Sequence, residues 1–313
     1  MSADPLSDVL RAVRLDGAFF YAVEASEPWS VKAVAANELT PRVLPGAEHL
    51  ISYHILTAGH CYGGLVGEEP VGLEPGDVIV FPHGDAHVMS GDPDSGVKSV
   101  PATPARFPET VTLGDGGRIT AAFVCGFLGC DRRPFNPLLS TLPHRLHLPG
   151  LSSGWLQSFA RQMVEESRAQ RVGADSVLTR LAELMFVEVL RRYIETLPPG
   201  QRGWLASLRD DVVGRGLGLL HGAPAHPWTL DELAGSVAIS RSAFADRFTA
   251  LVGQPPMQYL AQWRMQLAAG RLATGNAKVA AIAEEVGYES EEAFSRAFKR
   301  VMGVSPAAWR RGT

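Results

Sequence analysis

The sequence predicts a multidomain protein of the α+β class, in which a β-barrel of residues 1–150 is followed by a helical pair with a linker at 151–200 and an all-α domain at 201–313. Three observations predict this order. One unit of about fifty residues occurs twice in the last third of the chain. Short apolar runs separated by Gly and Pro clusters fill the first part, which is typical of an all-β sandwich or barrel. Apolar residues at helical spacing lie between these two regions.

Two matching offsets define the internal repeat. Leu233 in the first copy matches Ile282 in the second at an offset of 49, whereas Phe244 matches Phe294 at an offset of 50. The second copy therefore has one additional residue in the turn between these positions, and the remaining positions stay in register.

Each copy has the pattern of two short helices joined by a tight turn. Thr229 to Glu232 predicts a capping box, in which the Thr hydroxyl and the Glu carboxylate accept hydrogen bonds from backbone amides at the start of a helix. Ser240 and Ser290 are the predicted N-caps of the second helices. Each second helix carries a stripe at i, i+4 and i+7 and ends at a glycine that a proline soon follows. These residues are Phe244, Phe248, Leu251, Gly253 and Pro256 in the first copy and Phe294, Phe298, Val301, Gly303 and Pro306 in the second.

The two copies together predict an all-α double helix-turn-helix, joined by a helix from about Met257 to Ala273. The second helix of such a motif enters the major groove of DNA. The alternative is a protein-binding array of helical repeats, but such arrays need about three or more units to bury a continuous core. The repeat therefore favours DNA binding, with the two copies on successive turns of one face of the groove.

A denser set of residues in the second copy carries a family resemblance. It consists of Ile282–Ser290, Ala293–Arg300, Gly303, Ser305–Pro306 and Trp309–Arg310. This set resembles the signature of AraC/XylS-type transcription regulators, over about the last third of the chain. The resemblance implies binding to promoter DNA, contact with RNA polymerase and, usually, activation of transcription.

The resemblance also implies which residues face DNA, because base contacts in such regulators come from the exposed start of each recognition helix. The matching positions are Ser242, Ala245 and Asp246 in the first copy and Glu291, Glu292, Ala293 and Arg296 in the second. Arg296 is suited to a bidentate contact with guanine, whereas the carboxylates accept only from cytosine amino groups. The predicted phosphate contacts are Arg241, Arg247, Lys278, Lys299 and Arg300. For any single one of these charges, a solvated helix face is an equally good explanation.

Charge, length and cysteine content bound the remaining possibilities. From residue 204 onward 12 Lys or Arg stand against 10 Asp or Glu, which predicts modest DNA affinity per module, so that dimers or tandem sites would help. A chain of 313 residues with 46% hydrophobic residues has room for two cores. No apolar run reaches the roughly twenty residues that span a bilayer, and Met1 to Arg14 lacks a signal core. With three cysteines arguing against a disulfide-built secreted fold, we expect a cytoplasmic protein without membrane contact.

The predicted barrel contains a motif of its own. Strand-like runs occur at Phe19–Val23, Ile51–Leu56, Val78–Phe81 and Ile119–Phe123. Within them, Gly76–His87 has the spacing G-x5-P-x-G-x2-H, which resembles the second cupin motif, and Tyr53–His54 followed by Gly59 resembles an incomplete first motif. Cupins are jelly-roll barrels, and in AraC-type regulators such a barrel commonly senses an effector. The resemblance therefore implies a cupin-like, effector-sensing N-terminal domain.

A metal site is one hypothesis for this barrel. A complete cupin site has two His and one Glu from the first motif and one His from the second, which suits a divalent cation. Here Ser52 stands at the Glu position and the paired His is absent, so an oxygenase or isomerase site is incomplete. The remaining candidate ligands are His54, His87, Cys125 and Cys130, and imidazole with thiolate favours zinc. For each His, a hydrogen-bonded core residue is the simpler alternative.

Two other inputs compete with a metal. Redox sensing by Cys61, Cys125 or Cys130 requires an exposed cysteine of low pKa. Cys125 lies in an apolar run and is expected to be buried, whereas Cys130 beside Asp131 is expected to be exposed. The third hypothesis is a small apolar effector in the barrel, because barrel mouths are common ligand sites.

Apolar stripes at helical spacing predict the helical pair. The first consists of Trp155, Phe159 and Met163, and the second of Leu178, Leu181, Met185 and Val189, widened by Phe186, Leu190 and Tyr193. A face this broad predicts a homodimer contact, with packing inside the domain as the alternative. Leu197–Gly200 then forms a linker, and Trp204–His221 is predicted to be one further helix.

Three functions are therefore compared. The favoured one is a sequence-specific DNA-binding transcription regulator whose barrel senses a small molecule, a metal or an oxidant, and the resemblance implies that it is an activator. The second is a cupin metalloprotein with enzymatic activity tethered to a DNA-binding module, which the incomplete first motif disfavours. The third is an architectural DNA binder, which leaves the barrel without a role.

Overall fold

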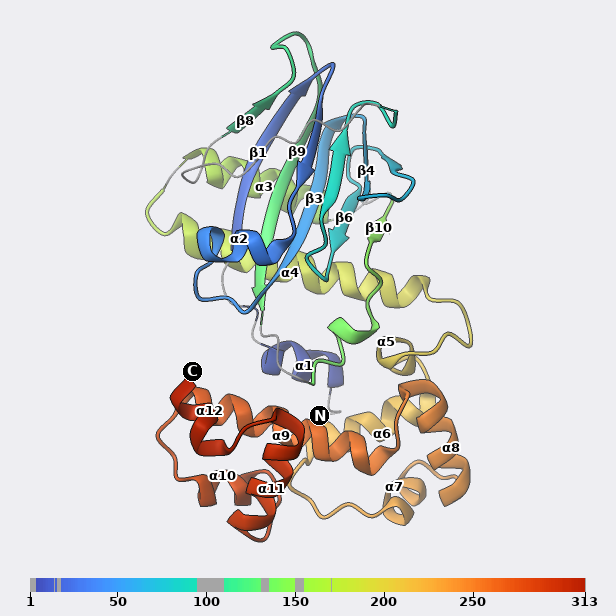
Figure 1. Cartoon of the computed structure of the whole chain (residues 1–313). Helices are drawn as coiled ribbons and strands as arrows, with labels where there is room; N and C mark the ends of the chain where they lie inside the picture. Colours follow the sequence, from blue (N-terminus) through green and yellow to red (C-terminus); the bar gives the residue numbers. More distant parts are fainter. Residues whose placement is uncertain are drawn as a thin grey trace. The chain divides into compact units, whose positions relative to one another are not determined.

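The computed structural model describes residues 4–13, 15, 18–94, 110–130, 135–149, 155–169 and 171–312 (Figure 1). Contacts between residues divide the chain into two compact units. The barrel unit comprises Leu15–Asp131 and Leu142–Thr196, and the helical unit comprises Met1–Arg14, Arg132–Thr141 and Leu197–Thr313. The chain therefore passes between the units four times, whereas the sequence suggested three consecutive segments.

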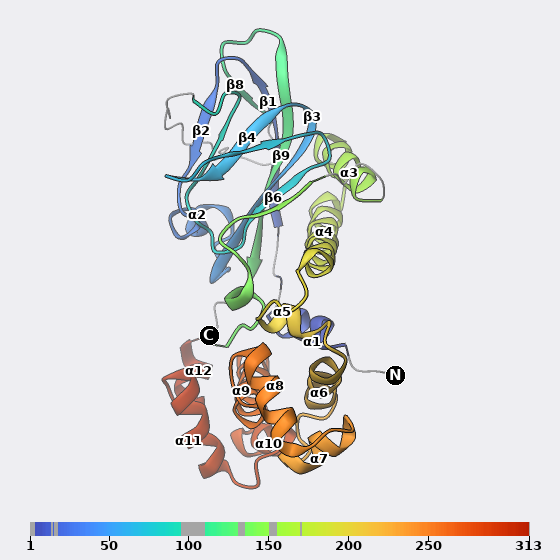
Figure 2. The same cartoon turned by 90° about the vertical axis from the view of Figure 1, so that its right-hand side faces the viewer.

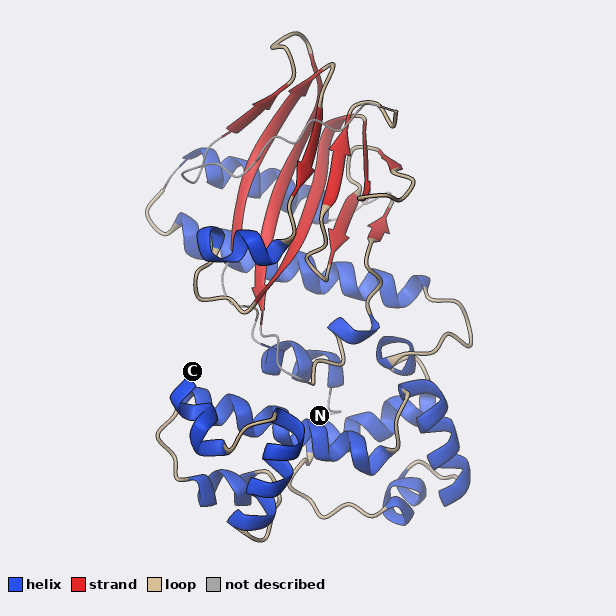
Figure 3. Ribbon diagram, viewed as in Figure 1, coloured by secondary structure: helices blue, strands red, loops and turns tan. Residues whose placement is uncertain are grey.

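The barrel unit contains two β-sheets (Figure 3). One has six strands in the order β10-β6-β3-β9-β1-β8 and the other has four in the order β2-β7-β4-β5. Every neighbouring pair is antiparallel except β1 and β8. The strands are β1 Ala18–Ser26, β2 Ser30–Ala33, β3 His49–Gly59, β4 Cys61–Leu65, β5 Val71–Leu73, β6 Val78–Phe81, β7 His87–Ser90, β8 Thr110–Leu113, β9 Ile119–Cys130 and β10 Leu146–Leu148. All four strand-like runs of the sequence lie in strands, namely β1, β3, β6 and β9.

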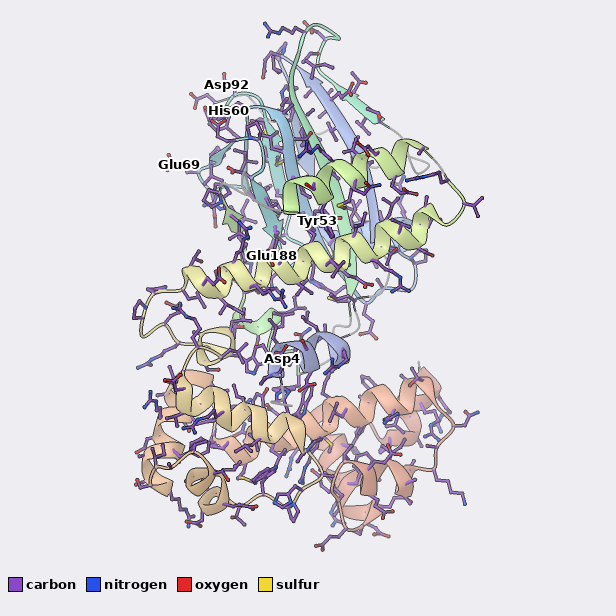
Figure 4. All side chains as sticks on the ribbon, turned by 180° about the vertical axis from the view of Figure 1, so that it is seen from behind. Asp4, Tyr53, His60, Glu69, Asp92 and Glu188 are labelled. Atoms are coloured by element: carbon purple, nitrogen blue, oxygen red, sulfur yellow. The ribbon has the colours of Figure 1, made fainter. Side chains whose placement is uncertain are left out.

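Both faces of the central strands β3 and β9 are covered. Their inward side chains, such as Leu56 and Phe127, belong to the core between the sheets. Tyr53 points to the opposite face, where it is 1% exposed on the side of the helices (Figure 4). This double burial explains why these strands have nearly continuous apolar sequences instead of alternating ones.

In its described residues the barrel unit also contains the helices α2 Ala36–Val43, α3 Trp155–Ala169 and α4 Ala174–Thr196. Helices α3 and α4 pack against the six-stranded sheet (Figure 2). Their buried residues include Met163, Leu178 and Met185, which come from the predicted apolar stripes. The predicted helical pair is confirmed, but packing within the unit accounts for most of its apolar face. This face therefore does not by itself require a second chain.

The helical unit contains α1 Pro5–Val13, a 3-10 turn at Leu139–Thr141, α5 Trp204–Ser207, α6 Asp211–Gly222, α7 Leu230–Ser236, α8 Arg241–Val252, α9 Pro256–Thr274, α10 Val279–Glu285, α11 Glu291–Met302 and α12 Pro306–Gly312. Helix α1, which the sequence did not predict, buries Leu6, Val9 and Val13 and contacts α6 and α9. The predicted single helix from Trp204 to His221 is two helices, because Asp210 caps α6 with its side chain. In the part of the chain that the structure describes, no helix is long and apolar enough to cross a membrane.

The two helix-turn-helix units are formed by α7 with α8 and by α10 with α11, and their caps agree with the sequence. The hydroxyl of Thr229 accepts from the Glu232 amide at 3.1 Å, and those of Ser240 and Ser290 accept from amides three residues later. Only half of the predicted capping box forms, because the Glu232 carboxylate is hydrogen-bonded to His226 at 2.8 Å. Gly253 and the corresponding Gly303 end α8 and α11 with φ of 87° and 81°.

Helix α9 contributes to the cores of both helix-turn-helix units. Phe248 of α8 packs edge-on against Tyr259 of α9, at a ring separation of 5.8 Å. In the second unit, Phe294 and Phe298 of α11 belong to one buried cluster with Met265 of α9. Both recognition helices are thus oriented by burying their phenylalanines near one shared helix.

Candidate nucleic-acid interface and barrel pocket

The outer face of α11 is polar and exposed, because its opposite face buries Phe294 and Phe298. Arg296, Lys299 and Arg300 are all exposed on this helix, and Ala293 is half-buried. Among the described residues, none of these three cations takes part in an ion pair. Glu291 and Glu292 lie in the first turn, where negative charge stabilises the positive end of the helix dipole independently of any DNA.

The outer face of α8 carries Ser242 and Asp246, both exposed, with Ala245 half-buried. Its two arginines are engaged within the chain, which the sequence did not indicate. Arg241 Nη1 lies 3.2 Å from Asp231 Oδ2, and Arg247 donates from Nε and Nη2 to Asp210 Oδ2 at 3.1 and 2.7 Å. Both arginines therefore have part of their charge compensated by a carboxylate of this chain. Lys278, the remaining predicted phosphate contact, is exposed at the N-cap of α10.

The carboxylate that holds Arg247 has a second task, because Asp210 is also the N-cap of α6. Partial burial acts to raise the pKa of Asp210, but hydrogen bonds from Arg247 and from the amides of Val213 and Val212 outweigh burial and lower it. Asp210 is therefore ionised at neutral pH and pairs with Arg247 as a charged partner.

The barrel unit encloses a pocket of about 210 Å3 between its sheets and α2. Most of its lining is apolar, and the lining residues are Val23, Val31, Ala33, Val34, Leu39, Met89, Val111, Leu113, Phe123 and Phe127. The polar lining falls into two groups. Tyr21, His54, His87 and Cys125 are buried, whereas Lys32, Glu38 and Arg42 are partly or fully exposed.

The buried polar group forms one hydrogen-bonded chain. His87 Nδ1 lies 2.9 Å from the Asp85 carbonyl, and the Nε2 atoms of His87 and His54 are 2.7 Å apart. On the other edge of its ring, His54 Nδ1 lies 2.9 Å from Cys125 Sγ, and Cys125 is in turn hydrogen-bonded to Tyr21. The register of β3 against β9 brings His54 opposite Cys125.

The direction of every hydrogen bond in this network of side chains follows from the Asp85 carbonyl at its end. A carbonyl only accepts, so His87 carries its proton on Nδ1 and accepts at Nε2. His54 must then donate from Nε2 and accept at Nδ1 from the Cys125 thiol, whose sulfur accepts from Tyr21. Each donor has one acceptor, and all four side chains are neutral.

Burial keeps the four side chains neutral. It lowers the pKa of His87 to about 4, against the opposing hydrogen bond to Asp85, and burial together with His87 holds the pKa of His54 well below its ordinary value. Burial also raises the pKa of the Cys125 thiol and of Tyr21 well above their ordinary values. This hydrogen-bonded network of Tyr21, Cys125, His54 and His87 therefore contains no thiolate and no imidazolium at neutral pH.

The predicted zinc ligands do not fit a metal ion in this arrangement. Two imidazole nitrogens on one tetrahedral zinc lie roughly 3.3 Å apart, which is longer than the 2.7 Å between His54 and His87. Cys125 lies at the other nitrogen of His54, and Cys130, five residues along β9, has its side chain on the opposite face of the strand. Nowhere in the described residues do three or more His, Cys, Asp or Glu side chains converge in a way that could hold a metal ion.

The three cysteines are all buried. The expectation that Cys130 is exposed is wrong: it is 2% exposed, and β9 extends to this residue, where it pairs with His49 of β3. Burial raises the pKa of Cys61 to about 12, with a smaller contribution from Asp77. None of these thiols has the exposure that a redox sensor needs.

Comparisons with known proteins agree with both parts of the chain. A cupin family model matches residues 4–195 and a helix-turn-helix domain model matches residues 233–312. A putative AraC-like transcription regulator of Streptomyces lividans is 34% identical over 311 residues, which cover 98% of each chain. The RCS-specific HTH-type transcriptional activator RclR of Escherichia coli is 26% identical over 269 residues, or 85% of this chain and 86% of its own. The solved DNA-binding domain of AdpA in complex with a target DNA is 29% identical, covers 33% of this chain and 92% of that chain, and has a TM-score of 0.32.

The chain belongs to the AraC-type family of transcription regulators.

As an AraC-type regulator, the protein binds DNA and regulates transcription, and it is not an enzyme. The cupin resemblance of Gly76–His87 is confirmed by the family match over residues 4–195. The sequence missed Tyr21 as a member of the polar chain, and the lining contributed by α2. Tyr21 lies in a predicted strand, so an inward tyrosine near the motif histidines was the available signal.

Asp210→Asn should strengthen DNA binding. Asn caps a helix as well as Asp does, so α6 keeps its cap while Arg247 loses its charged partner. We expect DNA affinity to rise about two- to fivefold, and the slope of log affinity against log salt to steepen by up to about one unit, because one more cation reaches phosphate. Fluorescence anisotropy with a labelled duplex across a KCl series measures both quantities. If the double variant Asp210→Asn/Arg247→Ala shows the same gain in DNA affinity, the gain comes from the loss of repulsion between the Asp210 carboxylate and DNA phosphate and not from Arg247.

Stability of the folded chain should fall between pH 7.5 and pH 5. The pKa of His87 is about 4 when folded and about 6.5 when unfolded, so the unfolded chain binds more protons in this range. The stability is complete above about pH 6.5 and is lost as pH falls towards 4, with His87 alone accounting for about 2 kcal/mol at pH 5. Urea denaturation at each pH measures the loss, and His87→Gln is the comparison. An equal pH dependence in both proteins would contradict the assignment.

Proposed function

We propose that the barrel pocket binds a small, mainly apolar effector, and that this effector sets how the helical unit acts on promoter DNA. The observation that carries the proposal is the pocket of about 210 Å3 enclosed by apolar side chains. This volume lies below the roughly 300–1,000 Å3 of sites for drug-sized ligands, which indicates a small molecule.

The polar residues of the pocket support an apolar ligand body with one polar end. In the chain from Tyr21 to the Asp85 carbonyl, every donor already has an acceptor, so a ligand beside it needs few polar atoms. Lys32, Glu38 and Arg42 line another part of the pocket and are at least partly exposed. A polar group of the effector would lie beside these charges.

Because the hydrogen-bonded side chains of the pocket are neutral, a bound metal or an oxidised cysteine is a weaker candidate than a small ligand for the signal that the barrel senses. A metal ion would have to displace the protons of His54 and Cys125 and separate the two imidazoles. An oxidant would have to react with a buried thiol whose pKa is raised. An apolar molecule needs neither change, because it only replaces the contents of the pocket.

We assign the DNA contacts to the exposed faces of α8 and α11. Arg296 is proposed to read a guanine, and Lys278, Lys299 and Arg300 are proposed to contact phosphate. Arg241 and Arg247 join them once released from Asp231 and Asp210. The remaining positions on these faces, Ser242, Ala245, Asp246, Glu291, Glu292 and Ala293, are proposed to lie at the groove edge.

The route from pocket to DNA is proposed to follow the chain itself. Strands β1 and β9 supply Tyr21 and Cys125 to the pocket. The chain before β1, Met1–Arg14, and the chain after β9, Arg132–Thr141, both belong to the helical unit. A ligand that shifts either strand therefore pulls on a segment whose other contacts lie in the DNA-binding unit.

A homodimer is proposed to form through the outer side of α4. One apolar face of α4 is buried within the barrel unit. Outside that face, Val177 and Leu184 are 42% and 49% exposed, and Leu181 between them is half-buried. These residues follow the i, i+4, i+7 spacing of one helix face. A dimer would double the phosphate contacts that one slightly basic module offers.

The protein is proposed to act in the cytoplasm as an activator that contacts RNA polymerase at promoters. The AraC-type membership supports this role, and the Escherichia coli relative carries the name of a transcriptional activator.

Filling the pocket should abolish effector binding. Val31→Phe places a ring in the pocket, whereas Val66→Phe makes the same change at a site 45% exposed in a turn outside it. In a thermal-shift screen of small apolar and amphipathic compounds, we expect compounds that raise the Tm of the wild type and of Val66→Phe but not of Val31→Phe, and that change DNA affinity. Native mass spectrometry checks that the variants are folded and reports bound zinc. Compounds that bind Val31→Phe equally, or stoichiometric zinc that depends on His87, would contradict the proposal.

Arg296→Ala should remove discrimination at one base pair. Loss of a bidentate contact is expected to cost about 1–3 kcal/mol on the preferred site and almost nothing on a duplex with the guanine replaced. Lys299→Ala, on the same helix, should instead weaken binding about equally on both duplexes and lower the salt slope by about one unit. Anisotropy titrations with duplexes selected from random sequence measure both. Uniform weakening by Arg296→Ala would make Arg296 a phosphate contact.

A further inference from the structure

Arg264 of α9 joins the two helix-turn-helix units through backbone carbonyl groups. Its Nε donates to the Pro224 carbonyl at 2.7 Å, its Nη2 to the His226 carbonyl at 2.8 Å and its Nη1 to the Gly287 carbonyl at 3.3 Å. The guanidinium carbon also lies 5.8 Å from the centre of the Tyr288 ring. All three nitrogens of the guanidinium are therefore engaged within the protein, so its role differs from that of a DNA-contacting arginine.

The three carbonyls belong to different parts of the repeat. Pro224 and His226 lie in the loop that leads from α6 into α7, the first helix of the first unit. Gly287 lies in the turn between α10 and α11 of the second unit. One side chain on the shared helix thus fixes the entry to the first unit and the turn of the second.

Direct backbone contact reinforces this connection. Gly287 has φ of +83°, and a Cβ added there would lie 2.4 Å from the Ala225 carbonyl oxygen and 2.8 Å from its Cα. At the corresponding turn of the first unit, Ala238 adopts φ of 61° with a Cβ present. The turn alone therefore tolerates alanine, and it is the close approach of the loop that requires glycine at 287.

The loop is in turn attached to α7. His226 Nε2 lies 2.8 Å from the Glu232 carboxylate of α7, and Trp228 Nε1 donates to the Ala223 carbonyl at 2.9 Å. Thr229 then caps α7. A continuous set of contacts runs from the second turn through Arg264 and the loop to the first helix of the first unit.

We propose that Arg264 sets the distance and rotation between the two recognition helices, and therefore the number of base pairs between the two halves of the DNA site. It acts as a positioning residue. The inference rests on the two units reading one DNA molecule together: rigidly held units bind a site of matching spacing as one ligand, whereas loosely held units bind each half nearly independently. Removing Arg264 releases the loop before α7 from the turn of the second unit, so that the two units can tilt relative to each other while each unit keeps its own core.

The test is binding-site selection from random DNA with the full-length protein, followed by titrations on the selected site. Duplexes carry either both halves at the selected spacing, both halves with one base pair inserted or deleted, or one half alone. The variants are Arg264→Met, which keeps the stem, and Arg264→Lys, which keeps the charge but lacks the planar fork. The control is Arg271→Met on the same helix, whose guanidinium makes an exposed 3.5 Å pair with Glu285.

In the wild type and Arg271→Met, a change of one base pair in spacing should weaken binding at least about tenfold, because the second unit loses its half-site. In Arg264→Met, affinity for the selected spacing should fall about tenfold, affinity for single halves should stay within about twofold, and changed spacings should bind as well as the selected one. Arg264→Lys should behave like Arg264→Met.

Two results would overturn the inference. One is a retained preference for the selected spacing in both Arg264 variants. The other is an equal loss on single half-sites, which would assign Arg264 to DNA contact or to folding. If circular dichroism shows that the Arg264 variants are unfolded, Gly287→Ala replaces them in the test. This substitution pushes the turn between α10 and α11 away from the loop before α7 while leaving Arg264 in place. An unchanged spacing preference in Gly287→Ala would then reject the inference. Absence of any sequence-selective binding by the wild type would instead count against the assignment of DNA contacts.

Discussion

The structure of the DNA-binding half depends on one constraint, which is that α9 must complete two hydrophobic cores. Tyr259, Leu260 and Trp263 are fully buried in its first half, and Met265, Ala268 and Leu272 are buried in its second half. A helix buried on nearly all sides is held by both cores, so each recognition helix is oriented against α9, and the contacts of Arg264 then restrain one unit against the other. The phenylalanines of α8 and α11 then fix which face of each helix remains exposed.

The same burial explains the polar network at the start of α9. The Tyr259 hydroxyl accepts from Trp204 Nε1 at 2.8 Å and lies 2.7 Å from His221 Nε2. A buried hydroxyl needs such partners, and they come from α5 and α6, which precede the repeat. These helices are therefore part of the first core. Helix α1 adds to this unit, since Asp8 Oδ2 lies 3.7 Å from His221 Nδ1.

The barrel also contains buried polar side chains that need hydrogen-bond partners. Two histidines, a cysteine and a tyrosine lie in an apolar interior, where unpaired polar groups are costly. Their single chain of hydrogen bonds leaves all of them neutral and satisfied, and it ends at a backbone carbonyl. The cupin motif positions are thus occupied by a closed polar network and most of the remaining lining is apolar, which is the combination expected of a small-molecule pocket.

Sequence reasoning succeeded where the signals are local. The caps Thr229, Ser240 and Ser290 and the terminal glycines lie within a few residues of the structure that they specify. It failed where the outcome depends on distant residues: Cys130 is buried at the end of β9, where it pairs with His49 of β3, and the pairing of His54 with Cys125 depends on the register between the same two strands. The pairing of Arg247 with Asp210, 37 residues apart, had no local signal either.

Helix α1 shows a different limit. Leu6, Val9 and Val13 follow a helical spacing that the sequence contains, but a nine-residue helix is only marginally stable alone and its partners α6 and α9 lie two hundred residues away. Its place in the helical unit therefore follows from packing that no short window of sequence reveals.

Hydroxyl-radical footprinting of the full chain on a site selected from random DNA reports where both helix-turn-helix units touch the duplex. Two recognition helices held in register by α9 should give two protected windows on one face of the DNA, with centres about 10–10.5 base pairs apart, which is one helical turn. A single protected window, or two windows on opposite faces, would contradict two recognition helices held in register by α9.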